Sequence, residues 1–439
     1  MDDRARQVEA QAEAETGDEG DLVTLALLAL LVGAAAGLVG ALFRMALEKA
    51  DHLRVVVIGW THGFSVLGLF LVVGLCAGAA MMAAWLVRRF SPHASGSGIP
   101  HVEAVLHGEA PPAPFVLLPV KFFGGVLAIG SGLALGREGP SVQMGAVFGH
   151  LVGAAFRRGW ADNRVLLAAG AGAGLATAFN APMAGAVFVL EELVQKFESR
   201  VAIAALAASS TAIATAHLLL GDSADFDLPA LKASPAAAGP LFFLLGGAAG
   251  LLAIAYNRGL LATLTMVGAS RLPVETRAGL VGAAAGALGW FAPGLVGGGD
   301  GLTQRALAGS ADIFVLPSVF LVRFWLGAVS YSAGTPGGLF APLLALGAQF
   351  GLLFGVACGL VLPGLELQPQ AFALVGMTAF FTGVVRAPLT GIVLVTEMTG
   401  SVAMLLPMLA ACFTAMLVPT ILRCPPVYDS LRARLLKGG

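Results

Sequence analysis

The sequence predicts an all-α polytopic membrane protein built from two related halves. Hydrophobic residues make up 57% of its 439 residues and charged residues only 12%, and the mean hydropathy is +0.86. Apolar stretches long enough to cross a bilayer, for which a helix needs about 20 residues, recur along the chain. Glycine and proline motifs in the first half reappear in the second half at a near-constant offset. These observations exclude an ordinary soluble domain.

The remaining composition argues against several classes of function. The 25 basic and 26 acidic residues give a net charge of −1, which offers no reason to expect a nucleic-acid partner. The seven histidines are scattered without an HExxH motif and the chain has no GxSxG motif, so we expect no metal site, no cofactor and no enzyme activity. The four cysteines lack CxxC spacing and are expected to be buried thiols: Cys76, Cys358, Cys412 and Cys424.

The predicted elements of the first half follow an acidic leader. Residues 1–21 hold eight acidic and two basic residues and no cleavable signal, which predicts a solvated, partly helical leader. The first membrane repeat is assigned to residues 22–220. Within it, residues 91–100 are too rich in glycine, serine and proline for a helix interior, so they predict a loop that opens a short helix. The expected helices cover 22–47, 64–86, 119–135, 142–156, 166–179, 182–192 and 201–220.

The second half begins after a connector. Residues 221–235 contain four charged residues and two prolines, which predicts an exposed segment. The second membrane repeat is assigned to residues 236–422, and residues 423–439 form a basic, polar tail. The expected spans of this half cover 241–267, 278–291, 313–329, 339–362, 372–384 and 402–422.

The two halves resemble each other in order and spacing. A shift of 202 residues pairs Lys121 with Arg323 and residues 136–140 with residues 338–342, and a shift of 206 pairs Glu191 with Glu397. An internal repeat whose helices are broken at corresponding places predicts a binding site near the bilayer midplane where the halves meet. Similarity alone leaves open whether the repeats are inverted or parallel.

Glu138, within the sequence Gly-Arg-Glu-Gly-Pro at 136–140, is the central candidate. Between residues 116 and 152 only Lys121, Arg137 and Glu138 carry a full charge, so Glu138 is expected at membrane depth, where an ionisable side chain is costly and usually functional. A helix is predicted to begin at Pro140. The free amides of a helix start attract an anion and a carboxylate alike, so the two would compete for one place. The alternative is a salt bridge to Arg137, although neighbours in sequence point different ways on a helix.

Three motifs together resemble those of the CLC chloride channels and proton-coupled chloride antiporters. They are residues 96–100 (Gly-Ser-Gly-Ile-Pro), 136–140 and 338–342 (Gly-Leu-Phe-Ala-Pro), which occur in the family's order. The resemblance covers most of the apolar region. It implies an inverted-repeat fold of broken, tilted helices in a homodimer with one pore per subunit. It also implies a multi-pass protein of the bacterial inner membrane with both termini cytoplasmic. Because the chain stops at Gly439, we expect no paired nucleotide-sensing domains.

The resemblance assigns the site residues. Glu138 would be the outer gate and proton carrier, and Glu192 matches the inner proton glutamate of the family's antiporters. Tyr428 is placed like the family's pore tyrosine. The anion would be bound by hydroxyl and amide donors of Ser97, Gly98, Ile99, Gly139, Leu339, Phe340, Ala341 and Tyr428.

Structural roles are the alternatives for each of these residues. Ser97 could be a helix cap, Glu192 could pair with Lys196 one turn later, and Tyr428 could be an aromatic anchor at the membrane interface. Glu191 and Glu397 are expected to be structural in at least one copy. The cations Lys121, Arg137 and Arg323 are expected to bind backbone carbonyls or fix helix ends.

The function implied is the exchange of chloride for protons. The alternative is a passive chloride channel on the same fold, and only the acidic Glu192 argues against it, because family channels commonly have an uncharged side chain there. Ser97 is similar to the chloride-preferring members, since nitrate-preferring relatives often have proline at that place. Fluoride and nitrate carriers remain further alternatives within transport.

Overall fold

Helices make up the regular secondary structure of the computed structural model, which describes residues 2–222, 224–229, 231 and 235–438. No strand longer than an isolated bridge occurs in these ranges. The helices are α1 (Asp2–Thr61), α2 (Ser65–Phe90), α3 (Ile99–Leu106), α4 (Leu117–Gly130), α5 (Glu138–Ala155), α6 (Trp160–Phe179), α7 (Pro182–Phe188), α8 (Ser199–Leu220), α9 (Gly239–Gly268), α10 (Val274–Phe291), α11 (Asp300–Leu307), α12 (Leu316–Tyr331), α13 (Phe340–Val361), α14 (Pro369–Val385), α15 (Pro388–Thr399), α16 (Leu405–Ile421) and α17 (Val427–Gly438).

The chain contains both helices that can cross a membrane and shorter apolar ones. Four helical stretches of the described chain are long and apolar enough to span a bilayer: Asp21–Phe90, Ser199–Leu220, Ala236–Gly268 and Phe340–Val361. Large apolar side chains on their outer faces are exposed, for example Leu67 at 69% and Leu244 at 61%. In a membrane protein such faces contact lipid, whose tails are as apolar as the side chains themselves. Shorter apolar helices of the described chain are α4, α12, α14, α15 and α16.

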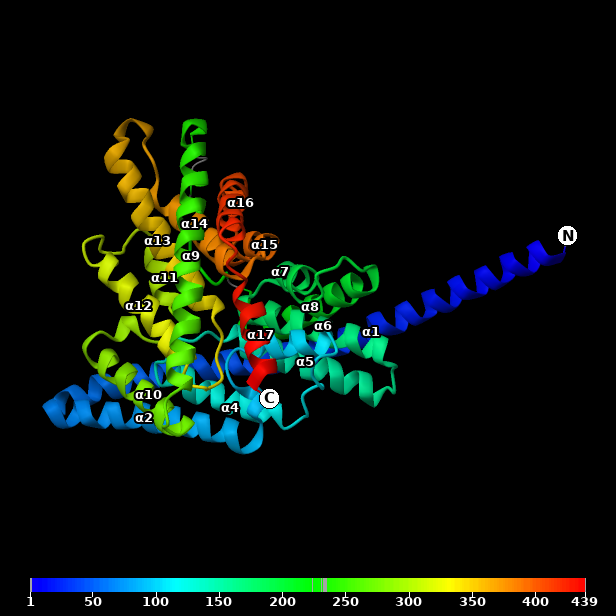
Figure 1. The fold of residues 1–439 in the computed structure, drawn as a ribbon, viewed down its shortest axis with the longest axis horizontal. Coiled ribbons are helices and arrows are strands. Elements are labelled where there is room, and N and C mark those ends of the chain that lie inside the picture. Colours follow the sequence, from blue (N-terminus) through cyan, green and yellow to red (C-terminus); the bar gives the residue numbers. More distant parts are fainter. Residues whose placement is uncertain (1, 223, 230, 232–234, 439) are drawn as a thin grey trace.

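The two halves pack in the same way. The close pair α5 and α6 corresponds to α13 and α14, and α1 against α8 corresponds to α9 against α16. In Figure 1, α1, α2 and α5 run from side to side, whereas α9, α13 and α16 run from top to bottom or are tilted toward that direction. Corresponding helices of the two halves therefore differ in direction. The halves meet where α2 packs on α10 and α7 on α15.

A reciprocal hydrogen-bond pair marks the axis between the halves. The Gly136 amide donates to the Gly338 carbonyl at 2.8 Å, and the Gly338 amide donates to the Gly136 carbonyl at 2.7 Å. This antiparallel bridge joins two residues that correspond in the repeat. An exchange of this kind is unchanged by a twofold rotation. A local twofold axis therefore relates the two halves at this bridge.

A second reciprocal contact involves Glu191 and Glu397. The Glu191 carboxylate accepts from the amides of Leu389 at 2.9 Å and Thr390 at 2.7 Å, at the start of α15. The Glu397 carboxylate accepts from the amides of Met183 at 3.0 Å and Ala184 at 2.8 Å, at the start of α7. Each acid thus satisfies free amides at the helix start of the other half. These contacts agree with the expectation that at least one of the two acids is structural.

Several predicted boundaries differ from the structure. The leader is helical from Asp2 onward and continuous with the first span, because α1 has no break before Thr61. The helix predicted over 119–135 ends at Gly130, since Gly132 adopts a left-handed conformation with φ +97°. The helix α5 begins at Glu138, two residues before Pro140, which still lies in the first turn, where no amide partner is needed. The tail contains the helix α17.

The connector is mostly exposed, as predicted, with an exception at two adjacent positions. Residues 221, 222, 224, 227, 229 and 235 are exposed, whereas the Asp225 side chain is only 4% exposed and Phe226 is 6% exposed. The reason is that this segment folds back onto both halves through contacts described below. Of the connector, residues 223, 230 and 232–234 lie outside the described residues.

Candidate functional site

Three broken segments converge at the starts of α3, α5 and α13. A methyl group at Gly139 would lie 2.6 Å from the Ser97 carbonyl oxygen, and one at Gly338 would lie 2.8 Å from the Gly139 amide nitrogen. Only glycine therefore permits these approaches. Gly98 caps α3 with φ +86°, a conformation that an L side chain rarely adopts. The glycines bring three sets of free helix-start amides into one region, which is a ready environment for an anion.

Glu138 lies at the centre of this region. It is the first residue of α5 and is 1% exposed. The backbone amide of Ala341, in the first turn of α13, and the amide of Glu138 itself lie close to the carboxylate. A methyl group at Gly338 would lie 3.1 Å from Glu138 Oε2, and this oxygen has no hydrogen-bond partner among the described residues. The carboxylate thus occupies the amide-lined start of the second-half helix.

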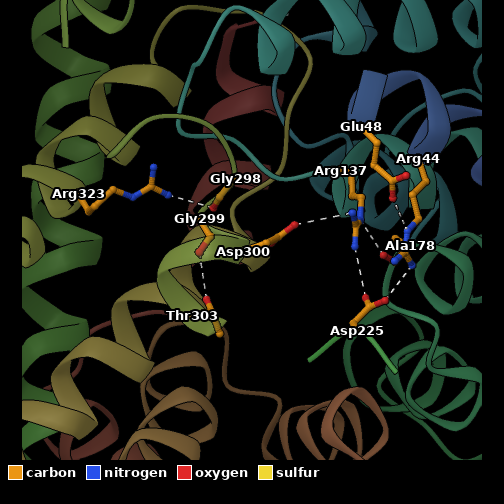
Figure 2. A network of polar contacts seen from close by, with 10 residues as sticks. All are labelled: Arg44, Glu48, Arg137, Ala178, Asp225, Gly298, Gly299, Asp300, Thr303 and Arg323. Carbon is orange, nitrogen blue, oxygen red and sulfur yellow. Dashed lines mark hydrogen bonds and ion pairs between the residues drawn. The ribbon is translucent and has the colours of Figure 1, made fainter. Parts of the chain in front are cut away.

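Arg137 turns away from Glu138 to other partners. Its Nε donates to the Ala178 carbonyl at 2.8 Å, and its ion pairs within the described residues are with Asp225 at 3.3 Å and Asp300 at 3.7 Å (Figure 2). The expectation that Arg137 binds a backbone carbonyl is confirmed. The alternative role of Glu138, a salt bridge to Arg137, is not found among the ion pairs of the described residues.

The other two cations hold the loops before the helix starts. Lys121 is fully buried and donates to the carbonyls of Ala94 at 3.1 Å and Gly96 at 2.8 Å. In the second half Arg323 donates to Gly297 at 2.7 Å and Gly298 at 3.0 Å. Both predictions of carbonyl binding are confirmed. The repeat partners therefore tie down equivalent loops.

Ser97 and the residues after it form the start of α3. Ser97 is completely buried, and its hydroxyl oxygen accepts from the Ile99 amide at 3.1 Å. The Ser97 amide donates to the Tyr331 hydroxyl at 3.4 Å. The cap alternative for Ser97 is thus present in the structure, and it leaves the hydroxyl hydrogen free to bond to another acceptor. The two roles are compatible.

Tyr428 and the start of α13 share an aromatic cluster. Leu339 and Phe340 are both 0% exposed, and Ala341 is 7% exposed. The ring of Phe340 lies 5.8 Å from that of Tyr428 and 5.8 Å from that of Phe188. Tyr428 is 0% exposed and its hydroxyl has no hydrogen-bond partner among the described residues. The alternative of a membrane-interface anchor is wrong, because such an anchor would face lipid and headgroups.

A cavity of about 430 Å³ reaches the start of α3. It is lined by Gly98, His101, Tyr331 and Arg434 among others, and Arg434 donates to the Leu264 carbonyl at 2.9 Å. The sequence reasoning missed Tyr331, whose contact with Ser97 bridges 234 residues. No local signal marks it, since it is one aromatic residue at the end of an apolar helix.

Glu192 lies on a single π-helical turn, Val189–Leu193, that follows α7. Such turns are frequent at functional sites. Glu192 is 7% exposed while Lys196 is exposed, and no ion pair joins them in the described chain, so the pairing alternative is wrong. The neighbouring acids whose negative charges most oppose ionisation of Glu192 are Glu103 of α3 and Asp429 of α17.

Glu103 was missed at the sequence level. It is 2% exposed, and its Oε2 has no hydrogen-bond partner among the described residues. The sequence feature that could have indicated Glu103 is its position as an acid among the apolar side chains of Ile99–Leu106. Glu103 and Glu192 extend the site from α3 to the π turn.

Comparison with known proteins agrees with this architecture. A family model described as voltage gated chloride channel matches residues 78–420. The H(+)/Cl(-) exchange transporter ClcA of Vibrio parahaemolyticus is 38% identical over 424 residues, covering 94% of this chain and 90% of that protein. ClcA of Cronobacter sakazakii is also 38% identical, over 423 residues, with the same coverage.

Solved structures show the same fold. A slow cyanobacterial Cl-/H+ antiporter superposes with a TM-score of 0.90 at 33% identity, covering 94% of this chain and 98% of that one. A eukaryotic CLC transporter gives a TM-score of 0.79 at 24% identity, covering 95% of this chain and 74% of that one, which supports the fold alone. By sequence and by structure, the chain belongs to the voltage-gated chloride channel family, the CLC family.

Proposed function

We propose that this chain is a secondary transporter that exchanges chloride for protons across the membrane. The observation that carries the proposal is the buried Glu138 carboxylate beside Gly338 at the start of α13, in the region where Gly139 contacts Ser97 and the Phe340 ring packs against that of Tyr428. The ClcA relatives, which are named as H(+)/Cl(-) exchange transporters, support the same activity. Chloride and protons are then the transported species, and neither is chemically converted.

Glu138 acts as the outer gate in this mechanism. When ionised, its carboxylate takes the place of an anion at the helix starts; when protonated, it loses that attraction and leaves the site. Each exchange of the side chain for chloride therefore carries a proton with it. The free Oε2 atom is the place where that proton binds.

Chloride is held by neutral donors. The hydroxyls of Ser97 and Tyr428 each supply one hydrogen bond, and backbone amides supply the rest: those of Gly98, Ile99, Gly139, Leu339, Phe340 and Ala341. A site without a full positive charge binds an anion firmly enough for it to enter and weakly enough for it to leave.

Glu192 serves as the inner proton group. Its carboxyl is buried, and it follows Phe188, whose ring packs against that of Phe340, which in turn packs against that of Tyr428. The buried Glu103 and the half-exposed Asp429 lie nearby and extend this acidic group toward solvent. Separate routes for the two ions are what coupling requires.

The assembly and placement follow the family. We propose a homodimer with one pore per subunit in the bacterial inner membrane, with both termini cytoplasmic. Residues 22–220 and 236–422 form its two membrane repeats.

The test is coupled transport in liposomes. With purified protein, a chloride gradient is imposed without a pH gradient, the membrane potential is clamped, and proton movement is recorded. Exchange predicts protons moving uphill, and loss of this movement in Glu192→Gln with chloride flux retained. Chloride flux without proton movement in the wild type would make the protein a passive channel.

A further inference from the structure

Asp225 brings the connector, residues 221–235, into contact with Arg137, the residue before Glu138. Its Oδ2 lies 3.3 Å from an Nη of Arg137, and its Oδ1 lies 2.8 Å from an Nη of Arg44 on α1 (Figure 2). The carboxylate is 4% exposed, although the segment around it is polar in sequence. A buried carboxylate is held by paired cations or it is costly. Asp225 is therefore an internal counter-ion rather than a surface charge.

Arg137 has one buried and one exposed acidic partner. The Asp300 carboxylate is 56% exposed and lies 3.7 Å away, whereas Asp225 is almost fully covered. Water screens an exposed pair far more strongly than a buried one. Asp225 is thus the buried counter-ion of Arg137, shared with Arg44, and Asp300 is the exposed one. The bond from Arg137 to the Ala178 carbonyl holds the guanidinium in place independently of either acid.

The connector is fixed around Asp225 by contacts with the second half. The Phe226 amide donates to the Met398 carbonyl at 3.2 Å, and the Phe226 side chain is buried. The Asp227 amide and carbonyl form two bonds with the side chain of Gln304, at 3.1 and 2.8 Å. The position of Asp225 is therefore set by α11 and α15 on one side and by α1 on the other.

Arg137 immediately precedes Glu138, so its net charge acts on the gate. We propose that Asp225 is a positioning residue for the proton step: by neutralising Arg137 it sets the pH at which Glu138 takes up its proton. The inference rests on the proposed function. An uncompensated cation beside Glu138 would stabilise the ionised, site-occupying carboxylate.

Other charged side chains also surround Arg137. Around Arg137 the charged side chains on the packed elements are Arg44, Glu48, Asp51 and Arg54 of α1 and Asp300 of α11. Glu48 and Asp51 are 57% and 47% exposed and already pair with Arg44 and Arg54. Asp225 is the most deeply buried acid of the group, so water screens its charge the least.

The experiment measures chloride efflux from liposomes at a series of pH values, equal on both sides, in wild type and Asp225→Asn. We expect the pH at which chloride efflux is half-maximal to fall by about one pH unit, because a nearby charge shifts the pKa of a carboxyl group by about one to three units. Asp222→Asn removes the same charge from an exposed position of the same connector and should leave the profile unchanged. Asp225→Glu keeps the negative charge and should give the pH profile of the wild type.

A second variant protects the test against a folding defect. Arg44→Gln removes the other partner of Asp225 and leaves more negative charge near Arg137, so the half-maximal pH should move toward alkali. Superimposable profiles for Asp225→Asn, Arg44→Gln and wild type would overturn the inference. Absence of uphill proton transport in the wild type would instead overturn the proposed function, so the two failures are distinguishable.

Discussion

Replacement of Glu138 by glutamine tests the competition at the anion site. The backbone amides of Ala341 and of Glu138 itself lie close enough to the carboxylate to stabilise its charge. A hydrogen bond to a charged group contributes about 1.5–3 kcal/mol and a neutral one about 0.5–1.5 kcal/mol, so glutamine forfeits roughly 1–1.5 kcal/mol for each amide that bonds to the ionised side chain. The ionised form also gives up hydration on burial, which offsets part of this difference.

The expected result is about a tenfold loss of side-chain occupancy, since about 1.4 kcal/mol corresponds to a factor of ten. Chloride then reaches the site more often, so its flux is retained or raised, while uphill proton movement disappears because the amide carries no proton. Parallel chloride and proton recordings from the same liposomes measure both. Proton pumping at the wild-type ratio in Glu138→Gln would refute the gate assignment.

Three further substitutions probe other parts of the structure. Ser97→Pro removes both the hydroxyl donor and the amide bonded to Tyr331, and should shift anion preference from chloride toward nitrate in a competition assay; an unchanged ranking would remove Ser97 from selectivity. Glu191→Gln weakens the acceptor for two amides of α15 and should lower unfolding free energy by about 1.5–3 kcal/mol in detergent, whereas an unchanged midpoint would contradict the cap. Gly145→Val would overlap the Gly170 carbonyl oxygen and separate α5 from α6, at a cost of about 1–3 kcal/mol, while Gly74→Val meets open space and serves as its control.

The sequence predicted the parts of the site that local chemistry marks. Glycine and proline break a helix wherever they stand, so residues 96–100, 136–140 and 338–342 could be located without a structure. An acid such as Glu138 in an apolar run is conspicuous for the same reason. The repeat offset then paired Lys121 with Arg323, and both indeed hold equivalent loops.

What the sequence could not predict depends on folding over long distances. Asp225 lies in a polar segment and looks exposed until the chain returns to Arg44 and Arg137. Tyr331 gains its position only through contact with Ser97. The helix α11 was missed because Asp300–Leu307 is short and half polar, so it has no apolar span to reveal it. Each of these follows from tertiary packing rather than from local pattern.

The competition between carboxylate and chloride is tested most directly by chloride binding at two pH values. Calorimetric titration of the purified protein in detergent at about pH 5 and pH 8 would compare protonated with ionised Glu138, on the principle that a ligand gains affinity when its competitor is withdrawn. We predict tighter chloride binding at the acidic value in the wild type and no difference in Glu138→Gln. Equal affinity at both pH values in the wild type would contradict the account.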